Sequence, residues 1–160
     1  MNPEEKMNSV TLRRLLARYF LERNWPLGLV TYARGQRRTF IQIDYGPRQL
    51  DRLLSLLALL HPLGSVPLAR VLEVEGIHLT RDALALIITP AVYDSDWVAA
   101  VHQLRWRGVR ALAVIIDPAS FLPESTMPPD AAEAVCAALQ ESDVPCFTVR
   151  LGDRLPEVLC

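Results

Sequence analysis

The feature that most constrains the fold of this chain is a pair of apolar runs, Ala83–Thr89 and Val109–Ile116, with a segment of helix length between them. Apolar runs of this length, bounded by polar residues or proline, predict strands that are buried on both faces. The segment between them predicts a helix over 97–107, because apolar residues recur there at helical spacing. Strands joined through a helix in this way pair in parallel by right-handed crossovers.

The rest of the chain extends this alternation in both directions. Two strand-like segments with a turn between them, 27–33 and 39–43, predict a hairpin at the edge of the sheet. The other predicted helices are 10–23, 50–60, a shorter one from Pro67, 130–140 and 153–159, and the last predicted strand is 144–149. We therefore predict an α/β fold of three layers, with a mostly parallel sheet and one antiparallel hairpin at its edge.

A chain of 160 residues suits one domain, which we place at residues 10–160. Met1–Asn8 is polar and charged, so residues 1–9 predict a disordered N-terminal segment. The stretch 117–129 holds four prolines and predicts a long loop.

The composition is typical of a packed globular protein, with 51% apolar and 22% charged residues. A net charge of −1 gives no bulk attraction to nucleic acid or to a membrane, and no apolar run reaches the roughly 18 residues that span a bilayer. We expect a cytoplasmic protein, tethered to a membrane only if these residues belong to a longer one. The cysteines Cys136, Cys146 and Cys160 form no C-x-x-C pair, so we expect reduced thiols, with Cys136 in the core.

Few residues carry a pattern that indicates chemistry. None of the three histidines has Cys, Asp or Glu at metal-ligand spacing. Asp94 and Asp96 could hold a cation, but they also lie where a helix needs a cap and negative charge, and capping is favoured. Ser65 follows Gly64 at a predicted helix start, where free N–H groups could bind an anion. Core or half-buried packing is the favoured interpretation of the three tryptophans, Trp25, Trp97 and Trp106.

Four segments resemble those of one bacterial family. They are Leu15–Tyr32, Arg48–Leu54, Asp94–Ala100 and Ile116–Phe121. The family is domain-of-unknown-function family fifty-eight, whose members are similar to von Willebrand factor A domains and are often encoded beside MoxR-type AAA+ ATPases. The resemblance covers residues 10–155 and implies a central parallel sheet with helices on both faces.

The resemblance also implies where a metal would bind. In metal-binding von Willebrand factor A domains a cation is held by an Asp-x-Ser-x-Ser loop, by a Thr and by an Asp at the end of a further strand. Here the first motif has no counterpart, Val66 takes the place of the Thr, and Pro90 takes the place of the Asp. Because a hard divalent cation needs about six oxygen ligands, we expect no metal, no cofactor and no catalysis.

The resemblance therefore implies a non-catalytic protein–protein interaction domain with a degenerate metal site. The expected partner-binding residues lie in the loops at strand ends, at Ser65, Thr89, Asp94 and Asp96. The implied partner is a protein, and a MoxR-type ATPase is the candidate. Two alternatives stay open: a Rossmann-like or flavodoxin-like enzyme or binder of a small ligand or an anion, and a truncated gene product that only folds or self-associates.

In the family's sheet the absent first strand lies between the strands at 27–33 and 83–89. These strands must then pair directly, or something else must fill the gap, because unpaired backbone groups at a sheet centre are costly. We expect direct closure or a homodimer. A third alternative is that the chain is part of a longer protein.

Overall fold

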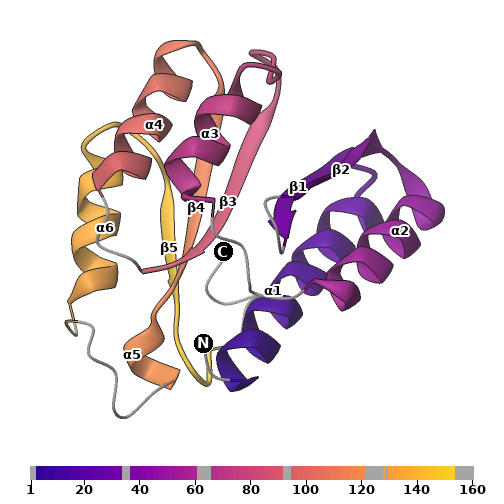
Figure 1. Ribbon diagram of the computed structural model, residues 1–160, viewed down its shortest axis with the longest axis horizontal. Coiled ribbons are helices and arrows are strands. Elements are labelled where there is room, and N and C mark those ends of the chain that lie inside the picture. The colour runs from indigo at the N-terminus through magenta and orange to yellow at the C-terminus, as the bar shows by residue number, and fades with distance from the viewer. Residues whose placement is uncertain are drawn as a thin grey trace. The chain divides into compact units, whose positions relative to one another are not determined.

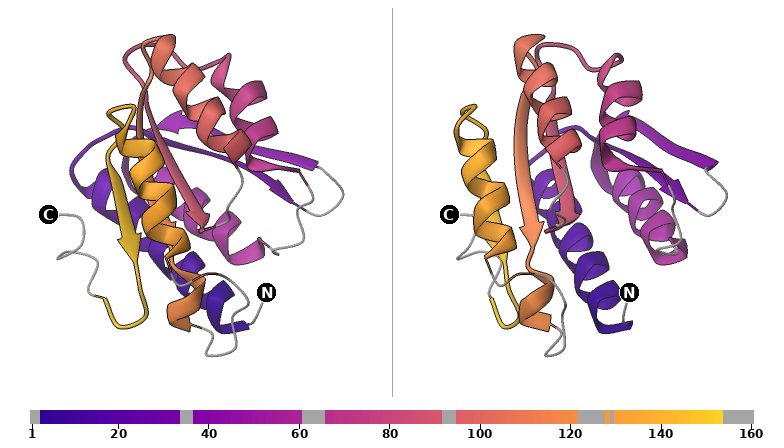
Figure 2. Two further views of the ribbon diagram at one scale, coloured as in Figure 1. Left: turned by 90° about the vertical axis from the view of Figure 1, so that its left-hand side faces the viewer. Right: turned by 60° about the vertical axis from the view of Figure 1, so that its left-hand side comes forward.

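The computed structural model describes residues 3–33, 37–60, 66–91, 95–121, 128 and 130–153. The chain divides into two compact units, Met1–Val66 and Pro67–Cys160, which are described separately below. Figures 1 and 2 show the elements of both units, coloured along the chain. The assignment of residues 10–160 to one domain stays a prediction.

Unit 1 is built from two helices and a β-hairpin. Its elements are α1 (Pro3–Glu22), β1 (Leu27–Ala33), β2 (Arg37–Asp44) and α2 (Gly46–Leu59). The strands pair in antiparallel orientation, and α1 and α2 run side by side (Figure 1). Their shared core contains Ala17, Leu21 and Leu53, against which Leu29 and Ile41 of the hairpin pack.

Helix α1 begins at Pro3, whereas the sequence predicts a disordered segment over 1–9. Its buried face also differs from the predicted apolar stripe. In the sequence Leu15, Leu16 and Tyr19 recur at a spacing that predicts one apolar stripe, but Leu16 is buried whereas Leu15 and Tyr19 are exposed. Successive helical residues point about 100° apart, so a wide apolar stripe has margins that one packing partner leaves uncovered.

A β-bulge near the start of β1 is held by a buried side chain of α2. The register shifts directly after Leu27, and Gly28 lies at the shift. A Cβ on Gly28 would come 2.8 Å from Ile41 O, so the close approach of the strands requires glycine here. Gln49 is 1% exposed, and its Nε2 donates to Leu27 O at 2.7 Å and to Gln42 O at 2.8 Å. The amide thus donates to one backbone carbonyl of each strand beside the bulge.

Unit 2 is a parallel sheet covered by helices. Its elements are α3 (Leu68–Gly76), β3 (Leu84–Pro90), α4 (Ser95–Trp106), β4 (Arg110–Ile116), α5 (Pro118–Phe121), α6 (Ala131–Gln140) and β5 (Cys146–Val149). The strands are parallel in the order β3-β4-β5, without a register shift. Because the chain crosses the sheet in one direction, right-handed crossovers place α4 and α6 on the same face.

The core of unit 2 lies between this face and the three longer helices, and α3 packs beside α4 (Figure 1). Odd-numbered strand residues point to it, and the fully or nearly fully buried members of the cluster are Ile87, Ala91, Trp97, Val101, Ala111, Ala113, Ile115, Ala131, Ala132, Val135, Cys136, Leu139 and Val144. The helical spacing of Val98, Val101 and Leu104 predicts that they point inward, which is confirmed for Val101 and Leu104, and Val98 packs at the margin of the core.

The α/β class is confirmed, with a parallel sheet and an antiparallel hairpin. The hairpin, however, is a sheet of its own among the described residues and not the edge of one mixed sheet. Direct pairing between the strands at 27–33 and 83–89 is likewise not among the described ladders, in which β1 pairs with β2 and β3 with β4. A sequence pattern predicts where strands form, but it does not predict which strands pair with each other.

The expectation of three reduced thiols is wrong for two of them. Cys136 of α6 and Cys146 of β5 form a disulfide, with 5.4 Å between their Cα atoms. The turn after α6 returns the chain under the helix, so residues ten apart in sequence come within bridging distance. Cys136 is part of the buried core, as predicted, and Cys160 lies outside the described residues.

Candidate functional site

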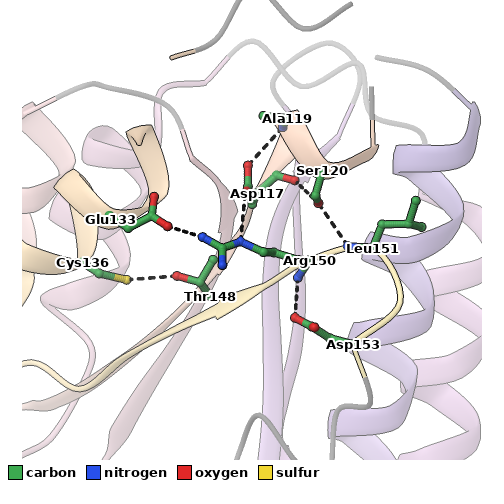
Figure 3. A network of polar contacts seen from close by, with 9 residues as sticks. All are labelled: Asp117, Ala119, Ser120, Glu133, Cys136, Thr148, Arg150, Leu151 and Asp153. Carbon is green, nitrogen blue, oxygen red and sulfur yellow. Dashed lines mark hydrogen bonds and ion pairs between the residues drawn. The ribbon is translucent and has the colours of Figure 1, made fainter. Parts of the chain in front are cut away.

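The carboxyl ends of β4 and β5 lie next to each other and are followed by Asp117 and Arg150 (Figure 3). In open α/β sheets this edge is the usual place for ligands and reacting groups. The Asp117 N–H donates to Val149 O at 3.0 Å, which extends the strand pairing by one residue. Strand pairing thus brings together two charged side chains that are 33 residues apart in sequence.

Asp117 is buried, and both of its carboxylate oxygens accept hydrogen bonds from the chain itself. Oδ1 accepts from the Ala119 N–H at 3.0 Å, and Oδ2 accepts from Arg150 Nε at 3.2 Å. The Ser120 hydroxyl donates to the Asp117 backbone carbonyl at 2.8 Å and accepts from the Leu151 N–H at 3.0 Å. Figure 3 shows these contacts converging from β4, α5 and the end of β5.

The same contacts explain helix α5, which lies where the sequence predicts a loop over 117–129. Pro118 occupies the first helical position, where proline is favoured, and the Asp117 side chain caps the turn through Ala119. The Asp117-Pro118 pair is typical of a helix start, but the prolines that follow it in this stretch favour the prediction of a loop. Residues 122–127 and 129 of the predicted loop lie outside the described part of the chain.

Arg150 links Asp117 to helix α6. Its Nη2 forms an ion pair with Glu133, and its backbone N–H donates to Asp153 Oδ2 at 2.8 Å. The hydrogen bond to Asp117 and then the charge of Glu133 raise the pKa of Arg150 above its usual value, so the guanidinium remains charged. Among the described residues, one guanidinium and three carboxylates therefore meet at this edge.

This geometry is that of a clamp. Each Asp117 oxygen accepts one hydrogen bond, Oδ1 from Ala119 and Oδ2 from Arg150, so the carboxylate is fixed between the start of α5 and the end of β5. Beside it, the Thr148 hydroxyl lies 3.5 Å from the Cys136 sulfur and is the donor, because a disulfide sulfur carries no proton. Among the described residues no three His, Cys, Asp or Glu side chains are grouped so that they could hold a metal ion.

Two of the four predicted partner-binding residues fall within the described residues. Thr89 lies near the end of β3, half-buried, and its hydroxyl donates to Pro90 O at 3.2 Å. Asp96 lies exposed in the first turn of α4, where an acidic side chain interacts favourably with the helix dipole. Ser65 and Asp94 lie outside the described residues. The anion site that the sequence predicts at Ser65 therefore stays a prediction.

A second candidate surface lies at the opposite end of the strands, where α3 and α4 end. We define the Trp106 surface as Ile77, Arg81, Trp106 and Arg107, all of which are exposed. The Trp106 side chain is 93% exposed and Ile77 is 66% exposed. Arg107 Nη2 donates to Ile77 O at 3.2 Å, and the stem of Arg81 lies so close to Gly108 that a Cβ there would meet it at 3.3 Å. The ends of α3 and α4 thus expose two large apolar side chains, Ile77 and Trp106, together with the two arginines.

The sequence interpretation of the tryptophans is right for Trp97, which is 2% exposed, and wrong for Trp106. The signal was in the spacing. Trp106 lies nine positions after Trp97, and at about 100° per residue the two point to opposite sides of α4. Trp25, which stacks on the ring of Phe20, is half exposed.

Comparisons of the chain with protein-family models and with curated proteins find no match. Within the described residues, every helix is too short or too polar to cross a lipid bilayer. The cytoplasmic localisation stays a prediction.

Proposed function

We propose that this chain is a non-catalytic protein–protein interaction domain of the von Willebrand factor A type, with a degenerate metal site. The observation that carries the proposal is Trp106, a large apolar side chain almost fully exposed at the end of α4. Tryptophan is enriched among the few residues that dominate interface energies, because its burial on binding removes a large apolar area from water.

The charge around this ring indicates the kind of partner. Arg107 directly follows Trp106 and binds Ile77 O, the exposed Arg81 lies against Gly108, and arginine is also enriched in interfaces. A partner that fits here has an apolar pocket bordered by carboxylates. A MoxR-type AAA+ ATPase, which the resemblance to family fifty-eight implies, is the first partner to test.

The clamp at the other end of the strands supports the non-catalytic part of the proposal. Asp117 is the buried carboxylate at the edge where α/β enzymes place reacting groups, and it is engaged by Ala119 and Arg150. Val66 and Pro90 lack the side-chain oxygens that the family's metal sites use. Both observations favour a binding role over a reaction.

The test is binding of the purified chain to a purified MoxR-type ATPase, measured by calorimetry for three proteins. Trp106→Ala should weaken binding by about 30-fold, which corresponds to a hot-spot contribution of about 2 kcal/mol. Gln103→Ala, an exposed position one turn earlier on the same helix, is the matched control and should bind like the unmodified chain. Equal affinities for the unmodified chain and Trp106→Ala would refute the assignment of the surface, and no binding would refute the assignment of the partner.

A second measurement tests the degenerate metal site. Titration with Mg²⁺, Mn²⁺ and Ca²⁺ should show no micromolar binding, because Val66 and Pro90 offer no side-chain oxygen. Micromolar binding that is abolished by Thr89→Val would overturn this part of the proposal.

A further inference from the structure

Strand β3 has the composition of a central strand but lies at the edge of its sheet. It pairs with β4 on one side, and no described residue pairs with its other side. From Leu84 to Thr89 it contains no charged residue, no proline and no bulge, which are the features that protect edge strands from pairing with other chains. Leu84 is exposed, and Leu86 and Ile88 are half-buried.

The backbone direction of each residue in β3 follows from one hydrogen bond. The Ala91 N–H donates to Ile116 O at 2.9 Å, so Ala91 faces β4. In a parallel pair, alternate residues direct both their N–H and their C=O groups to one neighbouring strand. The residues of β3 that face β4 are therefore the odd-numbered ones, and Leu84, Leu86 and Ile88 direct their N–H and C=O groups to the open side.

The strand β4 supports this assignment independently. Ala113 of β4 and Asp117, which directly follows it, donate their N–H groups to Pro145 O and Val149 O, on the β5 side, at 2.9 and 3.0 Å. The even-numbered residues of β4 are then left to face β3, as the register of Leu84 with Arg110 requires.

We propose that the open side of β3 is the interface with a second copy of this chain, paired in antiparallel orientation about a two-fold axis at Leu86. In this register Leu86 lies opposite Leu86 of the second copy, and Leu84 lies opposite Ile88 in both directions. Each of these pairs exchanges two hydrogen bonds, since all three residues direct both backbone groups outward. The result is one continuous sheet with the strand order β5-β4-β3 in each copy, meeting at β3.

The two-fold arrangement fits β3 at both ends. Pro90 has no N–H group, and its carbonyl already accepts from the Thr89 hydroxyl at 3.2 Å, so the ladder stops there. The pairing starts at Leu84, and the charged Arg81 and Asp82 come before the strand begins. Because no charged residue lies within the paired segment, two copies meet without like charges opposite each other.

The first test is the mass of the chain in solution between about 1 and 500 μM, measured by sedimentation equilibrium. We expect a monomer–dimer equilibrium for the unmodified chain. Leu86→Lys and Leu86→Glu should each raise the dimer dissociation constant at least tenfold, since each places two like charges opposite each other at the axis. Leu86→Val, which keeps the edge neutral and favours strand geometry, is the matched control and should still dimerise.

Mixing the two charged variants is the decisive experiment. Only a residue on the two-fold axis faces itself, so Leu86→Lys and Leu86→Glu should form a mixed dimer at concentrations where each alone is monomeric. A monomer for the unmodified chain at 500 μM would overturn the proposal. A dimer that Leu86→Lys leaves intact, or charged monomers that do not combine when mixed, would overturn it as well.

A measurement on the unmodified chain covers the case in which the charged variants fail to fold. Amide hydrogen exchange of Leu86 and Ile88 should slow at least tenfold between 10 and 500 μM, because dimerisation buries their N–H groups in hydrogen bonds. The Ile87 amide faces β4 and should change much less. Exchange of Leu86 that is independent of concentration would contradict the proposed pairing.

Discussion

The disulfide between Cys136 and Cys146 should contribute a measurable share of the stability of unit 2. It closes a loop with a sequence separation of 10. In the chain-entropy account, a cross-link of that length removes roughly 9 cal/mol/K from the unfolded state, which is about 2.7 kcal/mol at 25 °C. Small domains have a total stability of about 5–15 kcal/mol, so the bridge is a substantial part of it.

The perturbation is Cys146→Ser, compared with the unmodified chain in the presence and absence of dithiothreitol. Cys146 is the better position because it is half-buried, whereas Cys136 belongs to the core and its replacement would also disturb packing. Reduction of the unmodified chain should lower the urea midpoint by about 1–3 M, since a loss of about 2.7 kcal/mol is divided by slopes of about 1–3 kcal/mol/M. The variant should show the lowered midpoint under both conditions.

Tryptophan emission is a suitable signal for this experiment. Trp97 is 2% exposed and lies in the core of unit 2, whereas Trp25 and Trp106 are already exposed in the folded chain. The change on unfolding therefore comes mainly from unit 2. If dithiothreitol moves the urea midpoint of the unmodified chain by less than about 0.3 M, the bridge does not provide this stability. The same conclusion follows if dithiothreitol shifts the midpoint of Cys146→Ser as much as that of the unmodified chain.

Two further predictions concern buried polar side chains. Replacing Gln49 by Leu should lower the free energy of unfolding in urea by about 2–3 kcal/mol, because it leaves the carbonyls of Leu27 and Gln42 without their side-chain donor. A decrease below about 0.5 kcal/mol would show that water replaces the amide at no cost. Asp117→Asn should lower the thermal midpoint, because it removes the charge that pairs with Arg150. The difference in midpoint from the unmodified chain should shrink in 1 M NaCl, where the screening length falls to about 3 Å. A difference that does not depend on salt would show that the loss of the ion pair does not cause it.

The sequence predicts the strands of unit 2 more accurately than the helix faces of unit 1. The predicted run 83–89 and the observed Leu84–Pro90 differ by one residue at each end, because proline and charged residues bound an apolar run sharply. Helix α1 lacks such limits at its start, and the burial of Leu16 but not Leu15 depends on which side of the stripe meets another element. Periodicity defines a stripe, but tertiary packing selects the part of it that is buried.

The disulfide and the bulge are two features that sequence periodicity does not predict. The prediction of reduced thiols rests on the absence of a C-x-x-C pair, but a helix followed by a returning strand brings Cys136 and Cys146 to 5.4 Å. Likewise, Gln49 lies on the apolar face of an amphipathic helix, where a polar residue is expected to be disfavoured. Gln49 is buried there because its side chain binds the backbone at an irregularity of the hairpin near Gly28, which is visible only once the strands are paired.

The clamp at the sheet edge, in contrast, could have been derived from the sequence. Asp117 directly follows the apolar run of β4, and Arg150 directly follows the last strand. Once the two strands are parallel neighbours with Ile116 opposite Val149, the residues that follow them must also be neighbours, and opposite charges there must meet. The step that the sequence reasoning lacked was to carry the register one residue past the strand ends. Because the charged groups at this end of the strands bind one another, a partner is expected to bind at the other end, where Trp106 is exposed.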